Sequence, residues 1–178
     1  MTSRVYQLNS QRIKISYRIV SSSLGYMLIA NSDRGICSIN LGDSPENLTL
    51  SLTEEFNQAT ITQDETSYQD CQEQILSYIA GKKFNLEFPL ALQGTLFQQQ
   101  VWQSLQRIPY GETRTYGEIA RDLGKPTASR AVGNACGANP IALIIPCHRV
   151  IRSDGSLGSY RWGIERKQKL IELERIKY

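Results

Sequence analysis

Residues 115–138 read TYGEIARDLGKPTASRAVGNACGA, and this stretch decides the fold. Thr115 followed by Glu118 is a capping box, which predicts a short helix that Gly124 ends. A second helix is predicted almost at once, over Thr127 to Ala138. Two short helices joined by a tight turn that contains glycine indicate a helix-turn-helix, a unit that many DNA-binding proteins share.

The second of these helices has small side chains around one long cation, Arg130. The small residues are Ala128, Ser129, Ala131, Gly133, Ala135, Gly137 and Ala138. Tight packing in a core explains the alanines but not the arginine. The alternative is a helix laid against DNA with Arg130 reaching into the duplex, as in groove-binding proteins that deform it.

Another helix is predicted just upstream. Thr95 and Gln98 form a second capping box, and apolar residues recur at helical spacing until Pro109-Tyr110-Gly111 ends the pattern. Before this helix, over residues 88–94, the periodicity loosens. We therefore expect two domains, at residues 1–92 and 93–178.

The N-terminal domain is predicted to be a small, mostly antiparallel sheet covered by helices. Apolar and polar residues alternate over residues 12–19, which indicates a strand with one buried face. Two further apolar runs, at residues 24–30 and 36–41, flank a turn-like segment and predict a hairpin.

Two helices are predicted to follow this hairpin. One begins at Ser44-Pro45, and the other has apolar residues at helical spacing from Tyr68 until Gly81 stops it. No chemical motif lies in this domain, so its role is predicted to be structural. With a mainly helical C-terminal domain, the fold class is α+β.

The composition is that of an ordinary globular protein. The chain has 178 residues, of which 40% are hydrophobic and 21% charged. No apolar run approaches the roughly 18 to 20 residues that a membrane span needs. The N-terminal residues do not resemble a signal peptide. We expect a cytoplasmic protein that does not bind membranes.

The cysteines suggest neither a metal site nor a disulfide framework. Cys37, Cys71, Cys136 and Cys147 are irregularly spaced, and the chain has one histidine, His148. Zinc sites of familiar spacing draw on clustered Cys and His ligands, and disulfide frameworks belong mainly to small secreted domains. We expect reduced thiols and no metal.

The charge is unevenly distributed along the chain. Residues 1–93 carry seven Lys and Arg against ten Asp and Glu, whereas residues 94–178 carry thirteen against seven. The basic half is where a polyanion would bind, although a solvated surface accounts for such an excess equally well.

Residues 141–150 read IALIIPCHRV and are the most informative stretch for chemistry. The apolar run predicts a buried strand that ends at Pro146, just before Cys147 and His148. Burial alone raises a thiol's pKa, whereas the positive groups or base that His148 and Arg149 can supply lower it. Neighbours in extended chain point to opposite sides, so contact between this thiol and imidazole needs a bridging water or a sharp turn. The plain alternative is an inert buried cysteine.

The segment Pro146-Cys147-His148-Arg149-Val150 resembles the active-site signature of the O6-alkylguanine-DNA alkyltransferases, also called methylated-DNA–protein-cysteine methyltransferases. The resemblance is specific over residues 95–163 and looser over the whole chain. Its other matching stretches are residues 94–102, 124–126, 130–133, 139–140 and 158–163. The chain looks most similar to the self-methylating C-terminal half of the bacterial adaptive-response protein, or to its free-standing relative.

The resemblance implies direct-reversal DNA repair that needs no cofactor. One alkyl group, from O6-alkylguanine or from O4-alkylthymine in double-stranded DNA, would move irreversibly to Cys147 after base flipping. Each molecule, a monomer, would therefore act once. In the family the helix-turn-helix enters the minor groove, which agrees with the small side chains noted above.

The resemblance also assigns the residues around the acceptor. His148 would activate Cys147 through water, and Glu174 would orient the imidazole. Glu174 matches by its spacing from the cysteine, and Glu172 is the nearby alternative. Asn139 would be the hinge between the recognition helix and the active-site segment.

The remaining assignments concern DNA and the guanine pocket. Arg130 would fill the gap left in the base stack when the damaged nucleotide is flipped out. Tyr116 would crowd the 3′ phosphate of that nucleotide and assist at the base. The DNA-facing residues would be Thr127, Ala128, Ser129, Ala131 and Gly133. The pocket would be lined by Tyr160 and Trp162 and by the backbone at Val150 and Arg161. Trp162 stands where some members have glycine, and its indole predicts a preference for methyl over bulky benzyl-type adducts.

Two other classes of protein remain as alternatives. A cysteine hydrolase would also use Cys147 beside His148, but it leaves the basic half and Arg130 unexplained. Alkyltransferase-like binding proteins recognise the same lesions without an acceptor cysteine, so the presence of Cys147 argues against that class.

Overall fold

The N-terminal half is built on a four-stranded sheet. In the computed structural model, which describes residues 12–176, the strand order is β3-β2-β1-β4. The strands are β1 (Lys14–Ser22), β2 (Gly25–Ser32), β3 (Gly35–Gly42) and β4 (Thr60–Gln63). The first three pair antiparallel, which confirms the predicted hairpin. The edge strand β4 pairs parallel with β1 and was not predicted.

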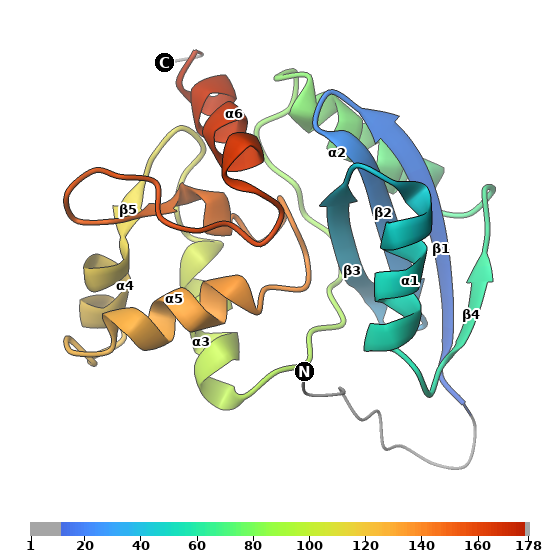
Figure 1. Ribbon diagram of the computed structural model, residues 1–178, viewed down its shortest axis with the longest axis horizontal. Coiled ribbons are helices and arrows are strands. Elements are labelled where there is room, and N and C mark those ends of the chain that lie inside the picture. The colour runs from blue at the N-terminus through green and yellow to red at the C-terminus, as the bar shows by residue number, and fades with distance from the viewer. Residues whose placement is uncertain (1–11, 177–178) are drawn as a thin grey trace.

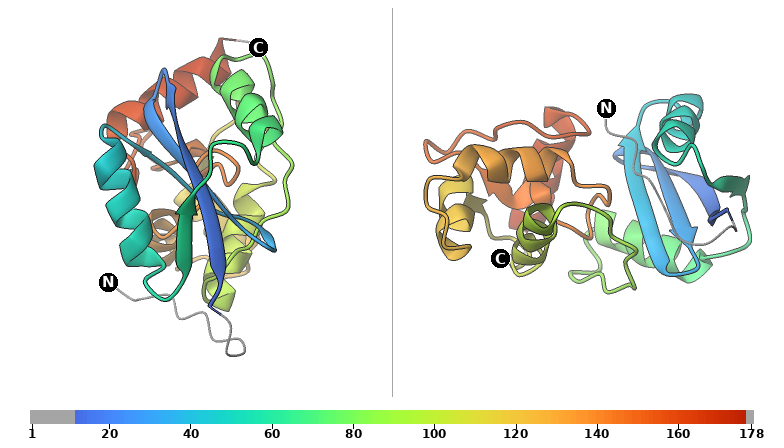
Figure 2. Two further views of the ribbon diagram at one scale, coloured as in Figure 1. Left: turned by 90° about the vertical axis from the view of Figure 1, so that its right-hand side faces the viewer. Right: turned by 90° about the horizontal axis from the view of Figure 1, so that it is seen from below.

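Both faces of this sheet are covered. Met27 and Ile29 on β2 pack into one core cluster, and Leu28 and Ala30 between them pack into another, because successive side chains of a strand point to opposite faces. Helix α1 (Pro45–Glu55) covers the second face and α2 (Gln69–Ile79) the first. Figure 2 shows the two helices on opposite sides of the strands.

The C-terminal half is mainly helical and lies beside the sheet (Figure 1). Its helices are α3 (Leu96–Leu105), α4 (Tyr116–Asp122), α5 (Ser129–Gly137) and α6 (Ile164–Arg175). Both predicted capping boxes are present, with Thr95 and Thr115 as N-caps. Helix α5 begins at Ser129, two residues later than predicted. A two-stranded parallel sheet joins β5 (Arg114–Thr115) to β6 (Val150–Ile151).

The apolar segment before Cys147 corrects the sequence prediction. Residues 141–145 do not form a buried strand: apart from one bridge between Ile39 and Ile141, they run through turns, with Leu143 at φ 70°. These residues are apolar because they are buried on all sides. A buried irregular segment and a buried strand both give a continuous apolar run, so periodicity cannot distinguish between them. A 3₁₀ turn, η1 (Cys147–Arg149), then supplies the sharp bend that the thiol and imidazole need.

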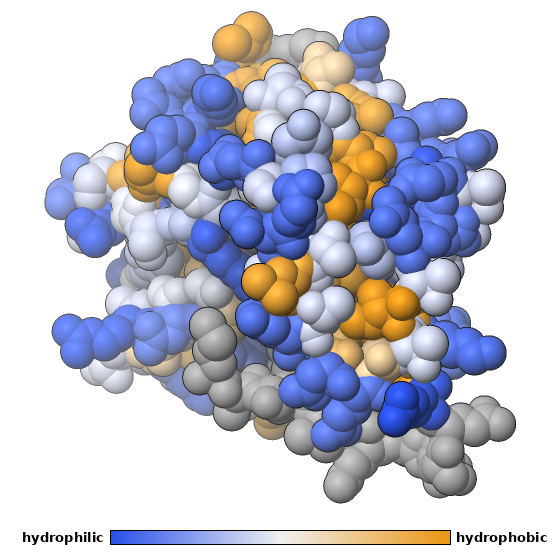
Figure 3. Space-filling view, turned by 45° about the vertical axis from the view of Figure 1, so that its right-hand side comes forward, coloured by the Kyte–Doolittle hydropathy of each residue, from blue (hydrophilic) through white to orange (hydrophobic). Residues whose placement is uncertain are grey.

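One hydrophobic core runs through both halves. It joins β2, β3 and α2 to α3, α5, α6 and the segment before Cys147. The face turned forward in Figure 3 shows apolar patches interrupted by hydrophilic side chains. No helix in the described part of the chain is long and apolar enough to cross a membrane. The architecture is α+β as predicted, and the domain boundary at residues 92 and 93 stays a prediction.

Candidate active site

Cys147 opens the 3₁₀ turn η1 and is held by Asn139. The residue is 4% exposed. Asn139 Nδ2 lies 3.1 Å from Cys147 Sγ and also donates to the Ile145 carbonyl at 2.9 Å. The Asn139 side-chain oxygen accepts from the Ile141 backbone at 2.9 Å. Asn139 therefore ties the end of α5 to the segment that carries the thiol, the position expected of a hinge.

The thiol is protonated in this conformation. Burial raises the pKa of Cys147 to about 11, although the Asn139 hydrogen bond and the Lys167 ammonium both favour the thiolate. A nucleophile of this kind needs a base that removes its proton when it reacts.

His148 is the base that the geometry offers. Its Nε2 lies 2.6 Å from Glu174 Oε1, and the imidazole is fully buried. Burial lowers the pKa of His148 below its usual value, so the ring is neutral at neutral pH. Because an ionised carboxylate only accepts, Nε2 carries the proton and Nδ1 carries the lone pair. Nδ1 has no hydrogen-bond partner among the described residues.

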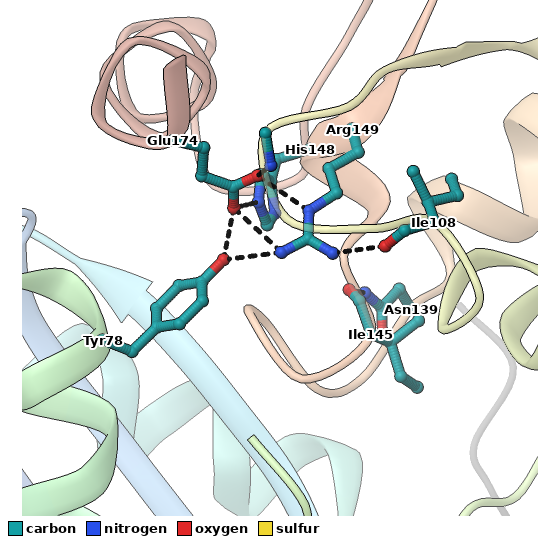
Figure 4. A network of polar contacts seen from close by, with 8 residues as sticks. Tyr78, Ile108, Asn139, Ile145, His148, Arg149 and Glu174 are labelled. Carbon is teal, nitrogen blue, oxygen red and sulfur yellow. Dashed lines mark hydrogen bonds and ion pairs between the residues drawn. The ribbon is translucent and has the colours of Figure 1, made fainter. Parts of the chain in front are cut away.

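Glu174 is ionised because several donors converge on it (Figure 4). Arg149 contacts it twice, from Nε at 2.8 Å and from Nη2 at 3.1 Å, and the Gly111 backbone donates at 3.1 Å. The Tyr78 hydroxyl, from α2, also donates to Oε1. Burial opposes the charge, but the hydrogen bonds from His148 and Arg149, together with the positive charge of Arg149, lower the pKa of Glu174 to about 2.

The structure chooses between the two carboxylates considered from the sequence. Glu174 is 2% exposed and contacts His148, whereas Glu172 is exposed and accepts a hydrogen bond from Gln168. Arg149 does not lie against the thiol but against Glu174. Sequence reasoning missed Tyr78 because it lies 96 residues from Glu174, and no local pattern marks it.

Lys167 was also missed, and it is fully buried beside the thiol. Its ammonium donates to the Val150 carbonyl at 2.6 Å and lies 5.8 Å from the centre of the Tyr116 ring. Burial lowers the pKa of Lys167 to about 8, and the negative form of Cys147 acts in the opposite direction. Lys167 therefore fixes one carbonyl of the expected guanine pocket.

The other residues expected in the pocket are Tyr116, Tyr160, Arg161 and Trp162. Burial raises the pKa of Tyr116 to about 12, so its hydroxyl is a donor. The Tyr160 hydroxyl is buried without a partner among the described residues, and its ring meets Trp162 edge-on at 5.2 Å. The Trp162 indole N–H donates to Asn40 at 2.8 Å, and Arg161 donates to the Asn139 carbonyl at 2.9 Å.

An open hollow of about 630 Å³ lies next to these side chains. It is lined by Arg152, Ser156, Leu157, Gly158, Ser159, Tyr160 and Ile164. Cys147 does not line the hollow, but Tyr160 does, and burial together with the negative form of Cys147 raises the pKa of Tyr160. The thiol thus lies near an opening but is closed off from it in this conformation.

Helix α5 has one buried face and one face that is open to solvent. Val132, Ala135 and Cys136 form its buried face, and Arg130 and Ala131 are exposed on the other. Thr127 is exposed, whereas Ala128, Ser129 and Gly133 are half-buried. The Arg130 side chain makes no hydrogen bond or ion pair with any residue that the structure describes. Helix α5 thus has a face packed in the core and a face exposed to solvent, and Arg130 lies on the exposed face.

All four cysteines are buried free thiols. Among residues 12–176, no group of three or more His, Cys, Asp or Glu side chains is arranged to hold a metal ion.

Two family models match the chain, one on each half. The family described as 6-O-methylguanine DNA methyltransferase, ribonuclease-like domain, matches residues 15–92. The family described as 6-O-methylguanine DNA methyltransferase, DNA binding domain, matches residues 96–176.

Curated relatives match nearly the whole chain. The bifunctional transcriptional activator/DNA repair enzyme Ada of Escherichia coli is 41% identical over 98% of this chain and 49% of its own length. The chain therefore spans about half the length of that relative. A methylated-DNA–protein-cysteine methyltransferase of Mycolicibacterium paratuberculosis is 42% identical over 90% of this chain and 93% of that protein.

Solved structures share the same arrangement. The O6-methylguanine methyltransferase of Mycobacterium tuberculosis has 39% identity and a TM-score of 0.79, covering 92% of this chain and 94% of that one. Mycobacterium tuberculosis OGT in complex with DNA has 40% identity and a TM-score of 0.79, covering 90% and 93%.

Proposed function

The chain belongs to the 6-O-methylguanine DNA methyltransferase family, and we propose that it repairs DNA by moving a methyl or other alkyl group from the O6 oxygen of guanine to Cys147. The observation that carries this proposal is the arrangement of Asn139, Cys147, His148 and Glu174. A thiol that receives one hydrogen bond lies in the same 3₁₀ turn as a neutral imidazole, and a buried carboxylate fixes the tautomer of that imidazole.

The proposed reaction follows from these contacts. His148 Nδ1 takes the Cys147 proton through a water molecule, and the thiolate attacks the alkyl carbon. A carbon–sulfur bond forms as the carbon–oxygen bond breaks, and guanine leaves with the bonding electrons. The Tyr116 hydroxyl, a donor with a raised pKa, stabilises the departing base. The thioether has no good leaving group, so each molecule reacts once and needs no cofactor.

Access to the thiol requires motion. Cys147 is 4% exposed and does not line the hollow, so the chain that covers it must shift before a flipped nucleotide can enter. We assign this shift to residues 156–160, which line the hollow. Gly155 and Gly158 have φ of 84° and 70°, which suits a segment whose backbone is tightly turned. The Val150 carbonyl, Tyr160, Arg161 and Trp162 would then surround the guanine.

DNA is the partner, and α5 is its proposed contact in the minor groove. The small exposed side chains permit close backbone approach, and Arg130 would fill the stack left by the flipped nucleotide. Thr127, Ala128, Ser129, Ala131 and Gly133 would line the contact. Such a surface distinguishes little between DNA sequences, as a repair protein requires when damage can occur at any site. We further propose activity on O4-alkylthymine, a monomeric state and a cytoplasmic location.

Intact-protein mass measurement tests this function. Mixing the chain with duplex DNA containing O6-methylguanine should add one methyl group per molecule, mapped to Cys147. Cys147→Ala should accept none and still bind the lesion, whereas Cys136→Ala, which changes another buried thiol, should still accept one. Repeated turnover with a thiol-reactive ester and no stable adduct would favour a cysteine hydrolase, and lesion binding without transfer would favour a binding protein.

A further inference from the structure

The N-terminal half reaches the active site through Tyr78. This residue lies on α2, its side chain is 2% exposed, and its hydroxyl donates to Glu174 Oε1. The same hydroxyl accepts from Arg149 Nη2 at 3.1 Å. Figure 4 shows the Tyr78 ring extending from the N-terminal half toward the carboxylate on α6.

Glu174 Oε1 accepts hydrogen bonds from three residues at once. It accepts from His148 Nε2 at 2.6 Å and from the Tyr78 hydroxyl, and Arg149 Nη2 adds a third donor at 3.1 Å. Donors that share one oxygen compete for its charge. The hydrogen bond from Tyr78 therefore weakens the stabilisation that Glu174 Oε1 gives to a protonated His148.

Tyr78 can hold this position at any physiological pH. Burial and the Glu174 charge both raise the pKa of Tyr78, so its hydroxyl remains a donor. Its ring also packs edge-on against Tyr110 at 5.6 Å. The ring contributes packing, and the hydroxyl contacts the carboxylate. Removing the hydroxyl oxygen alone therefore tests the second role and keeps the first.

We propose that Tyr78 is a positioning residue, whose hydroxyl orients the Glu174 carboxylate and withholds part of its charge from His148. The N-terminal half thus helps to keep the base neutral and ready to accept the Cys147 proton. The catalytic consequence of this inference rests on the proposed function, whereas the hydrogen bonding between Tyr78, Glu174 and His148 does not. The effect on His148 itself can be measured without DNA.

The first measurement uses the fact that the chain has one histidine. In Tyr78→Phe, the imidazole pKa followed by nitrogen-15 NMR should rise by about one unit relative to the unsubstituted protein, because a hydrogen bond to a charged group is lost. Tyr110→Phe is the matched control: it also removes a buried tyrosine hydroxyl, one without a hydrogen-bond partner among the described residues. It should leave the His148 pKa unchanged. Equal pKa values in all three proteins would overturn the proposal.

The second measurement follows single-turnover methyl transfer against pH. The acidic limb of the Tyr78→Phe profile should move up by the same amount, with the alkaline plateau within about twofold. A uniform fall at every pH, with an unmoved limb, would make Tyr78 merely structural. If no protein transfers methyl while the NMR shift is present, the proposed function fails and the positioning role stands.

A third variant guards against a Tyr78→Phe protein that does not fold. Replacing Tyr78 with 3-fluorotyrosine keeps the ring and makes the hydroxyl a stronger donor. The His148 pKa should then fall, and a rise or no change would contradict the proposal.

Discussion

Arg149 and Glu174 meet at two points in the interior of the protein. Arg149 Nε lies 2.8 Å from Oε2, and Nη2 lies 3.1 Å from Oε1. The guanidinium also donates to the Ile108 carbonyl at 2.6 Å. Arg149 thus compensates a buried carboxylate that in turn holds the imidazole of His148.

Removing this cation is expected to destabilise the fold strongly. Arg149→Ala should lower the free energy of unfolding by about 3–5 kcal/mol, because the Glu174 carboxylate is left buried without its counterion. Urea unfolding measures the loss. The control is Arg114→Ala, which breaks a solvent-exposed pair with Asp122 at 2.9 Å and should cost at most about 1 kcal/mol. Equal losses in the two variants would contradict this account.

Acidification is expected to weaken the fold in two steps. Burial holds the pKa of His148 below 6.5, so below about that pH the unfolded chain gains a proton that the native state refuses. The pKa of Glu174 falls from 4.5 to about 2, so its stabilisation is complete above 4.5 and lost as the pH falls toward 2. Glu174→Gln should abolish the second step in urea unfolding followed across this range. A variant that keeps the full acid dependence would refute the assignment.

Gly158 is expected to control the position of Tyr116. An added Cβ at Gly158 would lie 2.9 Å from the Tyr116 hydroxyl, whereas one at Gly155 would meet nothing within 4 Å. Both glycines have positive φ, so Gly155→Ala carries similar backbone strain and is the control. Gly158→Ala should slow single-turnover transfer by about 10- to 100-fold, since displacement of a reacting group is costly. Comparable rates in the two variants would argue against the contact.

Arg130 is expected to matter only when a base must be flipped. Arg130→Ala should slow transfer from O6-methylguanine in duplex DNA by about 100-fold, because no side chain then replaces the everted nucleotide. Transfer from free O6-methylguanine base should be unchanged, since nothing is unstacked. Equal slowing with both substrates would mean that Arg130 supports the active site itself.

Trp162 is expected to limit the size of the adduct. Its indole is fixed by Asn40 and packs against Tyr160, so it narrows the pocket through that ring. Trp162→Ala should raise the ratio of benzyl to methyl transfer by about tenfold or more. The ratio is measured on one protein sample with both adducts, so a partial loss of folded protein cancels. An unchanged ratio would remove Trp162 from the determinants of scope.

Local signals in the sequence predicted most helices and the hairpin correctly. Thr95 and Thr115 each satisfy a backbone donor three residues ahead, and such caps are written within four residues of chain. The edge strand β4 was missed because its four residues do not alternate clearly in polarity and pair with residues far away in sequence. Its existence depends on β1, which a local pattern cannot include.

The candidate site was predicted in part. Asn139, Cys147, His148 and Glu174 lie together as the resemblance implied, and their roles remain predictions. Tyr78 and Lys167 were missed because their contacts in the site are with residues that are distant in the sequence. A tyrosine or lysine on a helix carries no sign of the partner that buries it.

The backbone of β3 has a further consequence. Ile39 donates to the Pro140 carbonyl at 3.0 Å and accepts from Ala142 at 3.0 Å, so the edge of the sheet is closed by the stretch that leads to the thiol. We therefore expect the C-terminal half to be less stable when it is separated from the sheet. Without the N-terminal half it would lose these two hydrogen bonds and expose to water the apolar side chains that pack against β2, β3 and α2. The segment that leads to Cys147 would also lose the β3 backbone to which it is hydrogen-bonded.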